Sequence, residues 1–178
     1  MTTPDFQQSY FQLFDLPVQF ALDNVVLGKR FRQMQGQLHP DRFASKSQHE
    51  QRIAVQYSAF ANQAYTTLRK PLDRAFYLLE LAGMSNEQVS GEKIDGGFLI
   101  EQMELREKLE SIVDLVDPET VLEHLIVEII ADIKAHESEF TAAFEANDLS
   151  GAASACVKMQ YLEKLHQEAE QMESGLLD

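Results

Sequence analysis

Hydrophobic residues recur at helical spacing along most of the chain. The first long stripe has intervals of four, three and four residues, and it consists of Leu27, Phe31, Met34 and Leu38. Such intervals place apolar side chains on one face of a helix. The same pattern predicts further helices at 9–14, 48–68, 71–82, 98–113, 118–144 and from Ala155 to Met172. Because no stretch alternates apolar and polar residues as a half-buried strand would, we predict an all-α protein.

The stripe from Leu27 to Leu38 ends at the tripeptide His39-Pro40-Asp41. Proline has no backbone N–H to donate and disfavours helical geometry in the residue before it, so the helix must end here and the chain must turn. Further on, Ser47 and Glu50 have the spacing of a capping box, which predicts the start of the next helix. The tripeptide therefore opens a short polar loop between two antiparallel helices.

The tripeptide alone could be a simple helix stop, but the elements on either side of it point to a particular family. Leu13 and Phe14 precede it in a short helical turn, and an Ala/Tyr-rich helix that ends near Leu68 follows it. This arrangement resembles the J domain of DnaJ-type co-chaperones, a helical hairpin with His-Pro-Asp in its connecting loop. The resemblance implies a first domain over residues 1–82.

Three basic residues lie on the helix that leads to the loop. At about 100° per residue, Lys29 and Arg32 fall on the side away from the apolar stripe, and Arg30 falls on its flank. Such a face is often only solvated, but beside this loop we expect a docking face for an acidic partner. The resemblance implies that one set of residues contacts an ATPase chaperone: His39, Pro40, Asp41, Lys29, Arg30, Arg32 and Arg42.

The charge of the chain is divided unevenly. The net charge is −14, yet residues 1–76 carry nine Lys/Arg against six Asp/Glu, whereas the remainder carries six against twenty-three. This asymmetry favours two domains with different partners. It argues against nucleic acid as a partner, because a few basic residues on an acidic chain lack the broad cationic surface that phosphate binding requires.

The second half of the chain predicts a three-helix bundle. Residues 83–97 contain Ser85, Gly91, Gly96 and Gly97 and read as a connection, either a loop or a partly ordered linker. Three amphipathic helices with short connections follow in 98–178, and helices of this kind form a bundle.

The first helix of this bundle has two apolar faces. One side carries the expected core stripe, which consists of Phe98, Leu105, Leu109 and Ile112. The other side carries Leu99, Ile100, Met103, Glu104 and Glu107. A bundle needs only one buried stripe per helix, so the second face is either covered by the first domain or used as a contact site.

Two further segments, KPLDRAFYLLELAG at 70–83 and FLIEQMELREKLE at 98–110, extend the resemblance over nearly the whole chain. Together with the J domain they resemble the HscB family, J-type co-chaperones of iron-sulfur cluster assembly, in its bacterial form. The resemblance implies two partners, an HscA-type ATPase chaperone at the His-Pro-Asp loop and an IscU-type scaffold protein at the bundle. The implied scaffold contacts are Leu99, Ile100, Met103, Glu104, Glu107 and, from the last helix, Tyr161.

Two other functions remain as alternatives. A general J-domain co-chaperone of DnaK would normally have a glycine/phenylalanine-rich or cysteine-rich middle region, and the chain has neither. An assembly protein built from helices would contain His39-Pro40-Asp41 only as an accident of helix termination.

Several kinds of chemistry have no residues to support them. Cys156 is the single cysteine and the histidines lack metal-ligand spacing, so we expect no metal, no cluster and no other cofactor. No phosphate loop, dinucleotide motif or nucleophile elbow is present, so we do not expect an enzyme. The single cysteine, the lack of a signal peptide and the lack of a long apolar run favour a cytoplasmic protein with no membrane partner.

Overall fold

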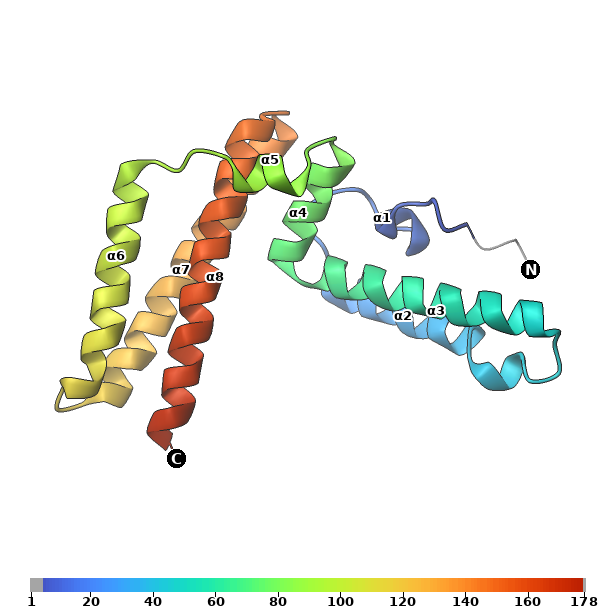
Figure 1. The fold of residues 1–178 in the computed structure, drawn as a ribbon, viewed down its shortest axis with the longest axis horizontal. Helices are drawn as coiled ribbons and strands as arrows, with labels where there is room; N and C mark the ends of the chain where they lie inside the picture. Colours follow the sequence, from blue (N-terminus) through green and yellow to red (C-terminus); the bar gives the residue numbers. More distant parts are fainter. Residues whose placement is uncertain (1–4, 178) are drawn as a thin grey trace. The chain divides into compact units, whose positions relative to one another are not determined.

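The computed structural model describes residues 5–177, and within them the chain forms eight α-helices, two short 3-10 turns and no strand (Figure 1). The predicted all-α class is therefore confirmed. The chain divides into two compact units between Leu78 and Leu79, and each unit has its own buried side chains.

The first unit is built on a helical hairpin. Helix α1 (Tyr10–Leu13) precedes the two long helices α2 (Asn24–Gln37) and α3 (Gln48–Arg69), and α2 and α3 run side by side in opposite directions (Figure 1). The start of helix α4 (Pro71–Leu81) also belongs to this unit. The hairpin is therefore the element that presents the connecting loop at one end.

Both helices of the hairpin begin at side-chain caps. The Asp23 carboxylate accepts the backbone N–H of Val25 at 2.8 Å, which fixes the start of α2. Ser47 and Glu50 form the predicted capping box at the start of α3. Hydrogen bonds from the Ser47 hydroxyl and backbone N–H hold the pKa of Glu50 below its usual value. The loop is thus closed by a well-defined helix start.

Small and aromatic residues pack the hairpin. Three alanines of α3, at positions 54, 61 and 64, are buried and allow close approach of neighbouring helices. The rings of Phe31 and Tyr65 stack with centroids 4.1 Å apart, which joins α2 to α3. The buried Arg74 donates to the carbonyl oxygen of Leu68 and lies 4.9 Å from the centroid of the Phe20 ring. These contacts order the end of the hairpin opposite the loop.

Arg30 holds the connection between α1 and α2. Its Nη1 donates to the carbonyl oxygen of Phe14 at 2.6 Å, to that of Asp15, and to Oδ2 of Asp15 at 2.9 Å. Asp15 has a φ of +50°, in the left-handed region that few residues other than glycine adopt. The guanidinium therefore satisfies the oxygens of a tight turn, and Arg30 is engaged inside the first unit.

The second unit is a bundle of three long helices. These are α6 (Gly96–Ser111), α7 (Pro118–Glu145) and α8 (Leu149–Leu177). Asp117 caps α7 and Pro118 occupies its first turn, as the sequence predicts. All three helices contribute to one core, which contains Phe98, Leu105, Leu109, Leu122, Leu125, Ile129, Ile133, Leu162, Leu165 and Ala169.

The segment 83–97, interpreted from the sequence as a connection, contains the short helix α5 (Asn86–Ser90). Ser85 forms a capping box with Gln88, and Val89 is fully buried. Helix α5 packs on α8, and the Ser150 hydroxyl of α8 donates to Glu92 at 2.7 Å. Much of this segment is therefore a packed part of the second unit.

Replacing Arg30 with alanine should lower the free energy of unfolding of the first unit by about 1–3 kcal/mol, because three acceptor oxygens lose a charged donor. Lys29→Ala is the matched control, since Lys29 is exposed, and it should change stability by less than about 0.5 kcal/mol. Urea unfolding followed by tyrosine fluorescence measures this, because four of the five tyrosines belong to the first unit. Equal unfolding midpoints for the two variants would contradict the role assigned to Arg30.

Candidate binding surfaces

The His39-Pro40-Asp41 tripeptide lies exposed at the end of the hairpin. Helix α2 ends at Gln37, and His39 takes the extended conformation (ψ 134°) that a residue before proline requires. Pro40 then starts a single 3-10 turn, Pro40–Arg42. The side chains of His39 and Asp41 are 60% and 90% exposed. The loop therefore offers these groups to a partner instead of burying them.

The imidazole of His39 is held by the backbone of its own loop. The backbone N–H of Asp41 donates to Nδ1 of His39 at 3.3 Å. Oδ2 of the Asp41 carboxylate lies 3.5 Å from the same nitrogen, so two groups of the loop lie against the imidazole. The Asp41 carboxylate nevertheless remains largely exposed.

Phe43 and a hydrogen bond from α3 hold the loop in place. Phe43 is buried, its N–H donates to the carbonyl oxygen of Pro40 at 2.9 Å, and its own carbonyl accepts the N–H of Lys46 at 2.9 Å. The side-chain amide of Gln51, from α3, donates to the carbonyl oxygen of Lys46 at 3.0 Å. An exposed tripeptide on a braced loop loses little conformational freedom when a partner binds it.

The predicted basic residues do not form one uniform surface. Lys29 and Arg32 are exposed on α2, and Arg42 is exposed in the 3-10 turn next to Asp41. Arg30 is instead held by Phe14 and Asp15. Its spacing on the helix flank could not show this, because its acceptors are backbone oxygens of a turn 15 residues away.

A second surface lies on α6. The core stripe is buried as predicted, whereas Leu99, Ile100 and Met103 are 41%, 58% and 64% exposed. Glu104 and Glu107 are also exposed, one and two turns further along the helix. The face is apolar toward the start of the helix and acidic toward its end.

Tyr161 extends this face onto α8. Its side chain is about half exposed, and its ring meets the buried ring of Phe98 edge to face, with centroids 6.3 Å apart. Since Phe98 directly precedes Leu99 and Ile100, Tyr161 lies beside the first turn of α6. The structure therefore brings together residues from two helices that the sequence separates by about 60 positions.

An ion pair that the sequence did not predict fixes the first turn of α6. Lys158 of α8 lies 3.3 Å from the Asp95 carboxylate and 5.6 Å from the centroid of the Phe98 ring. Asp95 caps α6 by accepting the N–H of Phe98 at 2.8 Å, and this bond, followed by Lys158, lowers the pKa of Asp95. Nothing in the sequence pattern indicated Lys158, because it lies on a different helix from Asp95.

Two further ion pairs hold the rest of α6. Arg106 donates to both carboxylate oxygens of Glu168 on α8 at 3.2 and 3.1 Å, and Lys108 lies 3.6 Å from Glu128 on α7. Two cations of α6 are thus paired with acids of α7 and α8. The outward side keeps the unpaired acids of the second surface.

The described residues were also searched for groups of metal-ligating side chains. Within 5–177 no three His, Cys, Asp or Glu side chains converge as a metal site would require. Cys156 is buried, and this burial raises the pKa of its thiol to about 12. In the same part of the chain, no helix is long and apolar enough to cross a bilayer.

Cys156 should resist Ellman's reagent in the folded protein at pH 8, because a thiol with a pKa of about 12 supplies almost no thiolate at that pH. In 8 M urea the same thiol should react fully, with one equivalent per chain, and free glutathione at pH 8 serves as the control for the reagent. Rapid reaction of the native protein would show that Cys156 is accessible and would reopen its use as a ligand.

Known proteins resemble this chain over nearly its whole length. Residues 94–170 match the family described as "HSCB C-terminal oligomerisation domain". The co-chaperone protein HscB homolog of Shewanella loihica is 40% identical over 171 residues, covering 94% of this chain and 99% of the relative. HscB of Vibrio cholerae superposes with a TM-score of 0.86 at 38% identity, over 95% of this chain and 99% of that one. Human HscB gives 0.86 at 31% identity, over 96% and 85%. The chain therefore belongs to the HscB family of co-chaperones.

Proposed function

We propose that this co-chaperone stimulates the ATPase of an HscA-type chaperone and delivers an IscU-type iron-sulfur scaffold protein to it. The observation that carries the first half is the Asp41 carboxylate, which is 90% exposed beside the imidazole of His39 on a loop held by Phe43 and Gln51. A cationic group of the chaperone would pair with Asp41, and the exposed imidazole of His39 would contact the chaperone beside it. Pro40 would keep the loop in the required turn.

The chaperone would contact α2 as well as the loop. Lys29, Arg32 and Arg42 are exposed and would face acidic side chains of the partner, which steer association more than they fix final affinity. Arg30 would contribute through the turn that it holds. These side chains supply contacts, and hydrolysis of ATP takes place in the partner.

The scaffold would bind the second surface. Leu99, Ile100, Met103 and Tyr161 offer an apolar area, and Glu104 and Glu107 offer an acidic end, so the fitting partner has an apolar patch beside basic residues. The two surfaces lie in different units of one chain. Binding both partners through one chain raises the effective concentration of each for the other, which couples delivery of the scaffold to ATP hydrolysis.

His39→Gln should reduce stimulation of the HscA-type ATPase by about tenfold or more, since the loss of one oriented polar group at the centre of an interface costs at least about 1.4 kcal/mol. His49→Gln, an exposed histidine at the start of α3, is the matched control and should behave as wild type. Steady-state ATP hydrolysis at increasing co-chaperone concentration is the measurement. Full stimulation by His39→Gln would exclude the J-domain function, and preference for a DnaK-type chaperone over the HscA type would support the general co-chaperone alternative.

Leu99→Ala combined with Met103→Ala should weaken binding of the scaffold by about tenfold or more, because two side chains lose apolar area at the contact. The additional ATPase stimulation that the scaffold provides should fall with it, while stimulation without scaffold should stay unchanged. Val127→Ala, at an exposed position on α7, is the control.

Thermal unfolding of the double variant separates contact from packing. Both side chains are exposed, so the unfolding temperature should match that of wild type. A clear loss of stability with unchanged scaffold affinity would mean that the face is buried by packing and that the scaffold binds elsewhere.

A further inference from the structure

The first turn of α6 carries part of the second surface but has little stability of its own. Helix α6 begins with Gly96 and Gly97, and the exposed Leu99 and Ile100 follow in the same turn. Glycine loses more conformational freedom than any other residue when it enters a helix. The first backbone hydrogen bond, from the N–H of Leu99 to the carbonyl oxygen of Asp95, is also long at 3.4 Å. Without further support, this turn would fray at the end of the helix.

One lysine of α8 supplies such support from outside the turn. The Nζ atom of Lys158 lies 3.3 Å from Oδ2 of Asp95, the residue that caps α6. The same ammonium group lies 5.6 Å from the centroid of the Phe98 ring. The side chain of Lys158 is only 18% exposed, so little of it is available to a partner. Lys158 therefore joins α8 to the cap and to the third residue of α6.

The ring of Phe98 is held from both neighbouring helices. Phe98 is 5% exposed, and its ring meets His136 of α7 edge to face, with centroids 5.6 Å apart. Tyr161 of α8 meets the same ring at 6.3 Å, and the ammonium of Lys158 lies near it as well. Because Phe98 directly precedes Leu99 in the helix, the position of this ring determines the direction in which the next side chain points.

We propose that Lys158 is a positioning residue for binding of the scaffold. It holds the first turn of α6, so Leu99 and Ile100 have their bound arrangement before the scaffold arrives. A surface that is ordered in the free protein loses less conformational freedom on association, and its affinity is higher for that reason. The proposal rests on the proposed function, since Lys158 acts through Leu99 and Ile100 and does not itself contact the scaffold.

The first test removes the charge of this lysine. Lys158→Met should raise the dissociation constant of the complex with the IscU-type scaffold by about fivefold, because binding must then order the first turn of α6. Lys158→Arg should bind nearly as wild type, since a guanidinium can still pair with Asp95. Lys134→Met, at an exposed lysine of α7, is the matched control and should bind as wild type. Isothermal titration calorimetry with the full chain is the measurement, and an unchanged dissociation constant for Lys158→Met would overturn the proposal.

The second test breaks the same ion pair from the other side. Asp95→Ser retains a side-chain oxygen that can cap α6 but removes the carboxylate that Lys158 contacts. The dissociation constant should rise as it does in Lys158→Met, and the double variant should bind no more weakly than either single variant. Additive losses in the double variant would mean that the two residues act separately, which contradicts the proposal.

The third test stiffens the turn itself. A Cβ at Gly96 would meet nothing within 4 Å outside its own turn, so alanine fits there and lowers the flexibility of the backbone. Gly96→Ala in the Lys158→Met background should therefore recover most of the lost affinity. Failure to recover it would show that Lys158 contacts the scaffold directly or stabilises the bundle as a whole, and the proposal would be wrong.

Hydrogen exchange of the free protein examines the turn without the scaffold. The backbone amides of residues 98–101 should exchange about fivefold faster in Lys158→Met than in wild type, because the turn opens more often. The amides of α7 should keep their wild-type rates. Unchanged exchange at 98–101, or faster exchange throughout the second unit, would contradict the role assigned to Lys158.

The outcomes distinguish this proposal from the proposed function. If Leu99→Ala with Met103→Ala weakens binding while Lys158→Met does not, the proposal is wrong and the proposed function stands. If the wild-type chain does not bind the scaffold, the proposed function fails, and the positioning role of Lys158 fails with it.

Discussion

The missing backbone N–H of Pro40 is the constraint on which the first unit depends. It ends the hydrogen-bond ladder of α2 and forces His39 into an extended conformation. The extended His39 places its Nδ1 within reach of the N–H of Asp41, and the Asp41 carboxylate lies 3.5 Å from the same nitrogen while it stays exposed. The turn and the orientation of the imidazole therefore follow from one covalent feature, and the buried Phe43 holds them in place.

The second unit depends on a different constraint, because it keeps apolar side chains exposed on a stable helix. Helix α6 buries one stripe in the core and makes further contacts with its neighbours. Ion pairs with Glu128, Lys158 and Glu168 supply these contacts from α7 and α8. Individually such surface pairs contribute little to stability, but they join both the beginning and the last two turns of α6 to the other helices. The contacts that α6 makes with α7 and α8 therefore determine which of its faces stays exposed.

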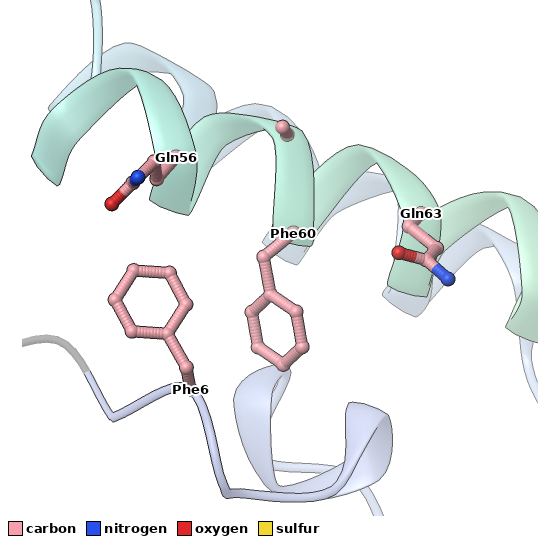
Figure 2. Close-up of a pocket in the computed structure, with 5 residues that line it drawn as sticks. Phe6, Gln56, Phe60 and Gln63 are labelled. Carbon is pink, nitrogen blue, oxygen red and sulfur yellow. The ribbon is translucent and has the colours of Figure 1, made fainter. Parts of the chain in front are cut away.

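The features that the sequence could predict are those that depend on residues close to one another in the chain. The helix stop at Pro40, the caps at Asp23, Ser47 and Asp117, and the two stripes of α6 depend on neighbours within a few residues, and the structure has them all. The engagement of Arg30 with a turn 15 residues away and of Lys158 with Asp95 depends on tertiary placement, which periodicity does not contain. Helix α5 was missed because five residues are too few for a periodic pattern. The contact of Phe6 with Tyr57 and with Phe60 of α3 (Figure 2) could not be predicted for the same reason as that of Lys158, since Phe6 lies about 50 positions away in the sequence.

Because charge is distributed unevenly along the chain, the two surfaces suit partners of different charge. The bundle carries most of the acids and places Glu104 and Glu107 at one end of its apolar face, so the scaffold of the proposed function would bring cations as well as apolar area. The first unit instead combines the basic side chains of α2 with an exposed carboxylate in the loop. An exchange of the two proposed partners would place apolar area against charge, and such a mismatch costs desolvation without compensation. In the proposed function, this difference would keep the two binding sites distinct.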